Sequence, residues 1–237
     1  MGTIELDGAG VEVPGAGDAD PPRQLLLPTT LTLSERRIAV IGPNGSGKST
    51  LVRLLNGLVR PSVGRVVVHG VDVGRHPRQA RRKVGFCFTD PSAQLVMPTC
   101  VEDVELSLRR DERDGTRRRA RALAALAEMG LTDQAEQSVH TLSGGQKQLL
   151  ALAGVLATGP EVLVADEPTT LLDLANSRRV ATLLLGLAQQ LVLVTHDLDL
   201  ARRCDRALLV ADGAVRLDGE PGEVVEAYVR SVEQDAR

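Results

Sequence analysis

The sequence predicts an α/β fold in which a mainly parallel sheet carries an inserted helical subdomain, and three observations support this. Short β-branched runs alternate with stretches of helical spacing, a pattern typical of parallel sheets covered on both faces. Between residues 90 and 157 the strand signal is absent and helical spacing takes over. The 237 residues suffice for one such core with a subsidiary lobe. We therefore predict a single domain, 1–237, with its core in 1–89 and 158–237 and its helical subdomain in 90–157.

The strands are predicted from apolar runs, the first of which is 38–41. The others are residues 65–69, 84–88, 162–165, 191–195 and 207–210. Ligands of parallel sheets bind at the carboxyl ends of the strands. A Gly-Lys turn, the acidic pair Asp166-Glu167 and the pair Thr195-His196 all fall at such ends. We expect these three pieces to converge on one site.

The remaining elements are helices and one hairpin. Residues 101–129 have helical spacing, and we interpret their arginine-rich stretch, 109–121, as a solvated helix face rather than a docking surface. A second helix is predicted for 147–157. Asp212-Gly213 is typical of a hairpin turn, and a last helix is predicted through 224–232.

The glycine-rich turn after residues 38–41 has the spacing G-x-x-x-x-G-K-S and opens onto a helical pattern. Backbone N–H groups of such a turn wrap phosphates, and the helix N-terminus adds the positive end of its dipole. Lys48 would reach the β- and γ-phosphates, and Ser49 would ligate Mg²⁺. The turn predicts a nucleoside triphosphate site formed by Gly42, Pro43, Asn44, Gly45, Ser46, Gly47, Lys48, Ser49 and Thr50.

A second anion-binding turn lies further along the chain. The stretch Leu-Ser-Gly-Gly-Gln at 142–146 precedes the helix predicted for 147–157, so a serine and two glycines stand where helix N-terminal amides can hold an anion. The chain therefore has two candidate phosphate-binding turns.

These motifs resemble those of the ATP-binding cassette family. The phosphate loop, the LSGGQ stretch, the Val-Leu-Val-Ala-Asp-Glu-Pro strand end at 162–168 and Thr195-His196-Asp197 occur in the family's order and spacing. The resemblance covers nearly the whole chain. It implies a P-loop NTPase core, ATP and Mg²⁺ as cofactors, and hydrolysis between two subunits. The residues that would close over the partner's nucleotide are Ser143, Gly144, Gly145 and Gln146.

The same resemblance implies roles for four further residues. Asp166 suits the Mg²⁺ shell through water, and Glu167 would polarise the attacking water. His196 would contact the γ-phosphate and hold the attack geometry. Asp173 matches the family's dimer-contact loop, although leucines precede it where small residues are common.

Two positions depart from the family pattern. The glutamine that usually follows the strand 84–88 is Thr89 here, so its ligand role would pass to water or to Gln94. The aromatic residue that usually stacks on adenine is missing near 11–14. We therefore expect loose selectivity for the base.

The length and motif content favour a transporter subunit within this family. The chain has one cassette and no long heptad insertion, unlike translation-type and DNA-repair-type cassettes. Residues 88–99 and 101–104 resemble the energy-coupling-factor subgroup, which imports vitamins and metal ions, and the strand-end motifs are similar to the ATPase subunits of biotin transporters. Cobalt or nickel uptake stays open, as does a regulatory module that closes on ATP without turnover.

Composition bounds the partners and the compartment. A net charge of −3 argues against a nucleic-acid-binding surface. Three scattered cysteines without metal-type spacing are typical of a reducing cytosol. No apolar stretch reaches the ~20 residues of a membrane-crossing helix. We expect a cytoplasmic protein, peripheral on the inner face of the cell membrane, that pairs with a second ATPase subunit, most simply its own copy. A transmembrane scaffold protein and a substrate-binding membrane protein would complete the assembly.

Overall fold

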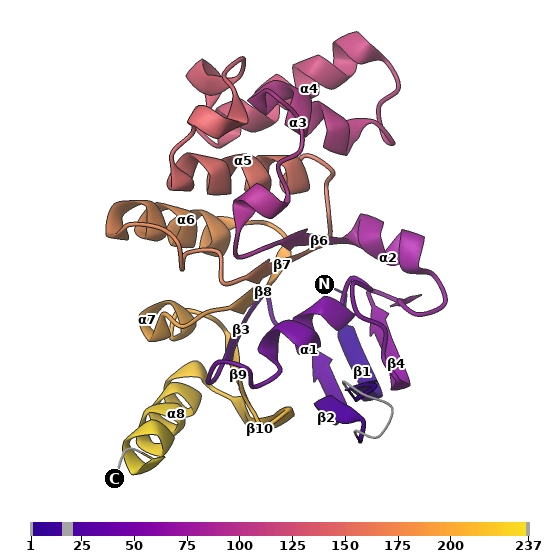
Figure 1. Ribbon diagram of the computed structural model, residues 1–237, viewed down its shortest axis with the longest axis vertical. Helices are drawn as coiled ribbons and strands as arrows, with labels where there is room; N and C mark the ends of the chain where they lie inside the picture. Colours follow the sequence, from indigo (N-terminus) through magenta and orange to yellow (C-terminus); the bar gives the residue numbers. More distant parts are fainter. Residues whose placement is uncertain (1, 16–20, 236–237) are drawn as a thin grey trace.

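A six-stranded sheet forms the centre of the computed structural model, which describes residues 2–15 and 21–235. Five neighbouring strands run parallel and one edge strand runs antiparallel, so the predicted mainly parallel sheet is confirmed (Figure 1). In spatial order the strands are β10 (Ala214–Gly219), β9 (Arg206–Ala211), β3 (Arg37–Ile41), β8 (Gln190–Val194), β7 (Val162–Asp166) and β6 (Val84–Cys87).

A second, antiparallel sheet lies beside the first and was not predicted. Its spatial order is β2 (Arg23–Leu33), β1 (Ile4–Val13), β4 (Val63–Val68) and β5 (Val71–Asp72). The prediction that residues 65–69 belong to the parallel sheet was wrong, because β4 pairs with β1 instead. The alternation along β1, where Ile4 and Leu6 are buried and Glu5 is exposed, is the pattern of a sheet with one wet face.

Successive residues of the central strands face opposite layers. In β7, Leu163 and Ala165 pack toward the helices of one layer, while Val162 and Val164 pack toward the antiparallel sheet and the helix after β3. A strand that is buried on both faces reads as a continuous apolar run, which is why these strands were recognisable from sequence. The covering helices are α1 (Lys48–Leu54), α2 (Pro77–Lys83), α6 (Leu174–Gly186), α7 (Leu198–Ala201) and α8 (Pro221–Asp235).

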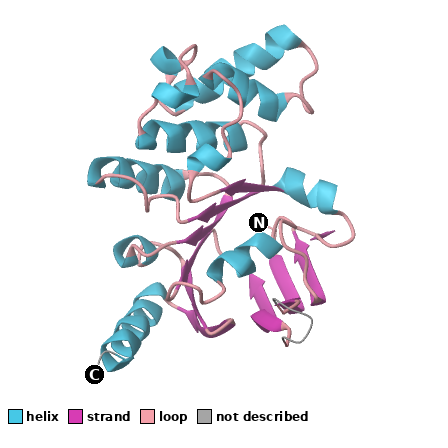
Figure 2. Cartoon of the chain, in the orientation of Figure 1, coloured by secondary structure: helices cyan, strands magenta, loops and turns pink. Residues whose placement is uncertain are grey.

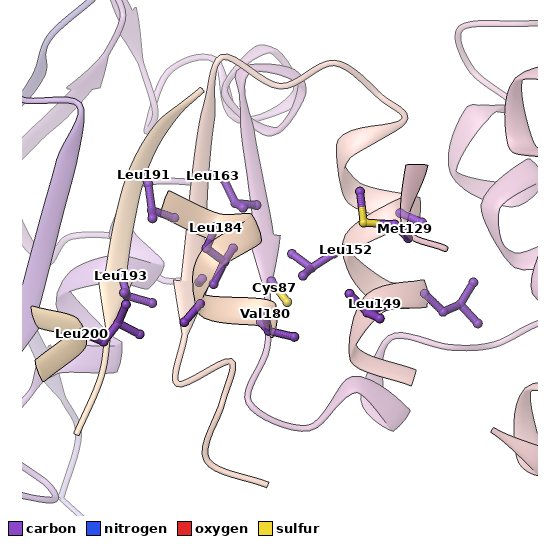
Figure 3. Packing of buried hydrophobic residues seen from close by; sticks show 14 of the residues in the cluster. Cys87, Met129, Leu149, Leu152, Leu163, Val180, Leu184, Leu191, Leu193 and Leu200 are labelled. Atoms are coloured by element: carbon purple, nitrogen blue, oxygen red, sulfur yellow. The ribbon is translucent and has the colours of Figure 1, made fainter. Parts of the chain in front are cut away.

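Three longer helices lie between β6 and β7 and form the upper part of the molecule in Figure 2. They are α3 (Cys100–Leu108), α4 (Gly115–Glu128) and α5 (Gly144–Leu156). The short 3₁₀ turn η1 (Pro91–Ala93) precedes α3, and η2 (Thr132–Gln134) and η3 (Val139–Thr141) lie between α4 and α5. Leu149 and Leu152 of α5 reach the core beside Val180 and Leu184 of α6 (Figure 3). The helical lobe therefore shares one apolar cluster with the central sheet.

The arginine-rich stretch begins directly after α3 and continues onto α4, and most of it is exposed, as expected. Two of its arginines form ion pairs nonetheless: Arg119 pairs with Glu105 and Glu136, and Arg118 lies 3.9 Å from Glu105. These pairs join α4 to α3 and to the segment after η2.

The predicted hairpin is confirmed. Asp212 and Gly213 turn β9 into β10 with φ of 51° and 71°, the left-handed conformation that a two-residue hairpin turn requires. The helix predicted near the end of the chain is α8, which buries Val224 and Val225 against the sheet. Among the described residues, we find no helix with the length and apolarity needed to cross a membrane.

Candidate nucleotide-binding site

The carboxyl ends of β3, β7 and β8 meet at one edge of the central sheet, because these strands are parallel neighbours. The glycine-rich turn follows β3, Glu167 follows β7, and His196 comes two residues after β8. The expected convergence of the three sequence-distant pieces is therefore observed.

The turn between β3 and α1 can be built only with glycine at two positions. Gly42 has φ of 141°, and a Cβ there would lie 2.0 Å from the carbonyl oxygen of Val210. Gly47 has φ of 103°, and its Cβ would lie 2.8 Å from the carbonyl oxygen of Leu25. The loop backbone is thus pressed against β9 and β2 while its amide groups precede the start of α1.

A cavity of about 530 Å³ opens over this loop, a size typical of small-molecule sites. Glu167 lines it, and so do two segments that sequence reasoning missed: the start of β2 and the turn between β9 and β10. No aromatic side chain is among the described lining residues, in line with the missing aromatic. The lining residues are Arg23, Gln24, Leu25, Asn44, Gly45, Ser46, Gly47, Lys48, Ser49, Thr50, Glu167, Asp212 and Gly213.

Lys48 is buried inside the loop. Its Nζ donates to the carbonyl oxygens of Gly42 at 2.9 Å and Pro43 at 2.8 Å. Burial lowers the pKa of Lys48, and the nearby carboxylates of Glu167 and Asp166 oppose that shift. An ammonium has three donors, so two hydrogen bonds hold the side chain and one donor is left for a ligand.

Asp166 is the most buried acid of the site, at 1% exposure. Its Oδ1 accepts from Ser49 Oγ at 3.0 Å, and its Oδ2 accepts from Arg53 Nη2 at 3.4 Å. Burial raises the pKa of Asp166, while Ser49 and Arg53 counteract it. Arg53 lies one turn after Ser49 on α1, a spacing from which its proximity to Ser49 could have been inferred.

The pair formed by Ser49 and Asp166 fits a magnesium ion. Mg²⁺ binds proteins through one or two oxygen side chains and completes its shell with water and phosphate oxygens. The described residues contain no cluster of three or more His, Cys, Asp or Glu side chains that could hold a metal alone. A hydroxyl and one carboxylate beside a phosphate loop are therefore the donor set that this cation uses with a nucleotide.

Glu167 and His196 are in direct contact. His196 Nε2 lies 2.8 Å from Glu167 Oε1, and Thr170 Oγ1 donates to Glu167 Oε2 at 3.3 Å. The backbone of Glu167 is left-handed, with φ of 53°, which is unfavourable for a residue with a Cβ and is typical of functional sites. The site therefore holds the Glu167 carboxylate at the cavity on a strained backbone, and the His196 imidazole fixes its position.

The LSGGQ stretch lies outside this cavity. Ser143 caps α5 by accepting from Gln146 N at 3.3 Å, while Gln146 Oε1 accepts from Ser143 N at 2.9 Å, a reciprocal capping box. A Cβ on Gly145 would lie 2.4 Å from Cγ of Asn176 on α6. None of the four predicted capping residues lines the cavity of its own chain: Ser143, Gly144, Gly145 and Gln146.

Asp173 begins α6 next to this stretch. Its two carboxylate oxygens accept from the backbone N–H of Asn176 at 2.9 Å and from its side-chain amide at 2.7 Å. These hydrogen bonds lower the pKa of Asp173. The flanking Leu171 and Leu174 are 62% and 67% exposed, so the predicted dimer-contact loop presents apolar surface.

Thr89 and Gln94 take different positions, and neither lines the cavity. Thr89 Oγ1 donates to the backbone oxygen of Asp166 at 2.8 Å. Both ends of the Gln94 carboxamide bond to β6 or to the residue just after it: Nε2 donates to Phe86 O at 3.0 Å and Oε1 accepts from Phe88 N at 2.8 Å. In the observed conformation Gln94 is turned onto the edge strand, away from the phosphate loop.

Known proteins share this sequence and architecture. The ABC transporter family matches residues 28–170. A Deinococcus radiodurans protein named only as an ABC transporter ATP-binding protein is 47% identical over 206 residues, which span 87% of this chain and 91% of that protein. The biotin transport ATP-binding protein BioM of Rhodobacter capsulatus is 40% identical over 238 residues, spanning 99% of this chain and 94% of that protein.

Two solved structures have the same fold. The dimeric ATP-binding cassette MJ0796, bound to ADP and Pi, has a TM-score of 0.82 at 30% identity and covers 92% of this chain and 98% of its own. Clostridium perfringens cbiO1, part of the ABC transporter complex cbiONQ, has a TM-score of 0.81 at 29% identity and covers 98% and 94%. The resemblance seen in the sequence motifs is confirmed. The chain belongs to the ABC transporter family as an ATP-binding subunit and is an ABC-type ATPase.

Proposed function

We propose that this chain is the energy-coupling ATPase of an energy-coupling-factor importer, with biotin as the favoured cargo. The observation that carries the ATPase part is the contact between Glu167 and His196 beside the Ser49 and Asp166 pair, at the mouth of the phosphate loop. The similarity to BioM over 99% of the chain supports biotin, and the cbiO1 fold supports the importer subgroup.

The hydrolytic step uses five side chains. Lys48 binds the β- and γ-phosphates from inside the loop, and Ser49 and Asp166 would hold Mg²⁺, Asp166 through water. Mg²⁺ supplies neutralisation of the charge that develops on the phosphates. Glu167 accepts a hydrogen bond from the attacking water and orients it. His196 fixes Glu167 and contacts the γ-phosphate, so positioning and charge stabilisation do most of the catalytic work.

The complete site requires a second subunit. Ser143, Gly144, Gly145 and Gln146 lie outside the cavity of their own chain, which is the arrangement expected if they cap a nucleotide held by a partner. We propose a homodimer in which the loop around Asp173 crosses the interface. Closure on MgATP would move residues 90–157 as a helical subdomain relative to a core of residues 1–89 and 158–237, and this motion would drive the transporter.

The membrane path belongs to other chains. We propose a transmembrane scaffold protein and a substrate-binding membrane protein as partners, with this subunit cytoplasmic and peripheral on the inner face of the cell membrane. The net charge of −3 supports the absence of a nucleic acid partner.

The rival cargo is cobalt or nickel, because the cbiO1 structure belongs to a cbiONQ complex. Membrane pull-down with tagged subunit, followed by reconstitution of the captured membrane proteins in vesicles, distinguishes the two. ATP-dependent uptake of labelled biotin, with none of cobalt or nickel, is the expected result. Metal uptake without biotin uptake would overturn the cargo assignment. MgATP-driven dimerisation without phosphate release would instead identify the regulatory module.

A further inference from the structure

The peptide bond between Asp166 and Glu167 is held from both sides. On one side Thr89 Oγ1 donates to the Asp166 carbonyl oxygen at 2.8 Å, and on the other Glu167 N donates to the Val194 carbonyl oxygen at 3.0 Å. β6 ends at Cys87, so the Thr89 hydroxyl supplies a hydrogen bond just beyond the end of the β6–β7 ladder. The orientation of this peptide plane is therefore set jointly by a side chain and by β8.

The orientation of this peptide plane sets the direction in which the Glu167 side chain leaves the backbone. Glu167 has φ of 53°, a conformation that a residue with a Cβ keeps only when its surroundings over-determine it. The contacts at its carboxylate, to His196 and Thr170, fix the far end of the side chain. The Thr89 and Val194 hydrogen bonds fix the near end. Removing either near-end bond would allow the plane to rotate and displace the carboxylate.

Thr89 also begins the segment that leads to the helical lobe, and that segment is tied down along its length. Gln94 joins it to Phe86 of β6 and to Phe88, just past the strand, through the two ends of its carboxamide. Asp103 of α3, itself buried, accepts from Val96 N at 2.8 Å and Met97 N at 3.0 Å. Hydrogen bonds thus tie this segment to α3 at one end and to Phe86 and Phe88 at the other, and Thr89, next to Phe88, bonds to the backbone of the strand that bears the two acids.

We propose that Thr89 is a positioning residue for Glu167: its hydroxyl orients the Asp166–Glu167 peptide and so sets the carboxylate for attack. This role differs from that of a glutamine that contacts the cation, because the hydroxyl acts on a backbone oxygen. Gln94 holds the segment to β6 and leaves Thr89 as the contact with the acid-bearing strand. The inference rests on the proposed role of Glu167 in hydrolysis.

The test compares Thr89→Val, which keeps the shape and loses the hydroxyl, with Thr89→Ser, which keeps the hydroxyl. Thr158→Val is the matched control, because Thr158 is also half-buried and its hydroxyl donates to a backbone oxygen at 2.7 Å outside the nucleotide cavity. We expect kcat of Thr89→Val to fall about tenfold or more, as misplacement of a reacting group does. Its KM for MgATP and its affinity for a fluorescent ATP analogue should stay within about twofold, because the phosphate loop is untouched.

The hydrolysis rates of these variants decide whether Thr89 positions Glu167. Loss of kcat in Thr89→Val, recovery in Thr89→Ser and no loss in Thr158→Val support the positioning role. A Thr89→Val enzyme with the kcat of the control overturns it, even if its melting temperature falls. Glu167→Gln is measured in parallel, alone and with Thr89→Val. Near wild-type hydrolysis by Glu167→Gln defeats the proposed role of Glu167, whereas its inactivity with a fully active Thr89→Val defeats only the inference about Thr89.

Discussion

His196 Nε2 and Glu167 Oε1 lie 2.8 Å apart, although 29 positions separate the two residues in the chain. The contact exists because β7 and β8 are parallel neighbours whose register pairs Asp166 with Val194, so the residues that follow the two strands emerge at the same edge. The His196 imidazole fixes the carboxylate of Glu167, a residue whose backbone is left-handed. A carboxylate held in this way at a cavity mouth can orient water without reorganising during the reaction.

Replacement of Glu167 with glutamine should separate binding from hydrolysis. The amide keeps the size of the side chain but is a far weaker acceptor for a proton of water, so phosphate release should fall by about 10²–10⁴-fold. MgATP binding should persist, and the dimer should accumulate in its closed form. Phosphate release and light scattering at saturating MgATP measure both effects. Wild-type turnover in this variant would remove Glu167 from its assigned role.

Mixing two inactive variants should restore activity if the LSGGQ stretch acts across the dimer. Lys48→Ala damages the phosphate loop, and Ser143→Arg damages the capping stretch, which lies outside the cavity of its own chain. A mixed dimer contains one site with both halves intact and one with both halves damaged. Random exchange should recover roughly a quarter of wild-type turnover, since half of the dimers are mixed and each has one working site. Activity that never exceeds that of the separate variants would show that both halves act within one chain.

Replacement of Asp166 with asparagine should stabilise the protein when nucleotide and cations are removed. Burial raises the pKa of Asp166 above the ordinary 3.8, so the folded state binds its proton more tightly than the unfolded state does. Stability is therefore lost as pH rises from 3.8 through the raised pKa, and near pH 7 the ionised carboxylate opposes folding. In EDTA at pH 7 the variant should melt roughly 2–4 °C higher, with the difference shrinking toward acid pH.

Asp173→Asn is the control for this prediction, and its effect has the opposite sign. The hydrogen bonds from Asn176 lower the pKa of Asp173, so its ionised form favours folding above pH 3.8 and this contribution disappears as pH falls through the lowered pKa. The control should therefore melt no higher than the wild type at pH 7. A melting temperature of Asp166→Asn below that of the wild type would mean that the bonds to Ser49 and Arg53 outweigh the desolvation of the carboxylate.

Selectivity between adenine and guanine should be weak. The described cavity lining includes Arg23 and Leu25 but no aromatic ring, so neither purine has a stacking platform that favours it. We expect kcat/KM for ATP and GTP to agree within about tenfold. Val13 pairs with Arg23 in the sheet, and Val13→Tyr should lower KM for ATP by placing a ring beside the cavity. A strong ATP preference in the wild type would show that other groups read the base.

The local motifs could be predicted from the sequence because each one depends on residues that are neighbours in the chain. The phosphate loop needs glycine at Gly42 and Gly47, where a Cβ would collide with the backbone of other strands, and the spacing around Lys48 reports that need directly. The hairpin at Asp212-Gly213 and the two-sided burial of β7 were predictable for the same reason. Each of these features depends on a short stretch and its burial, which periodicity and turn chemistry encode.

Other features depended on which segments meet in space. The apolar run of β4 reads like a buried parallel strand, and only its pairing with β1 places it in the antiparallel sheet. Likewise, the sequence allows the Gln94 carboxamide to contact either a cation or the edge of a strand. In the structure it hydrogen-bonds at the edge of the sheet, to Phe86 of β6 and to Phe88 just after it.

The sequence by itself determined that this chain has a phosphate loop, a signature stretch and two acids at a strand end, because those depend on local spacing and residue type. Only the tertiary structure decided three contacts. Thr89 hydrogen-bonds the peptide between Asp166 and Glu167, Arg53 reaches Asp166, and the start of β2 lines the cavity. Such contacts join residues far apart in the chain, and their geometry follows from strand order and register, which no single stretch specifies.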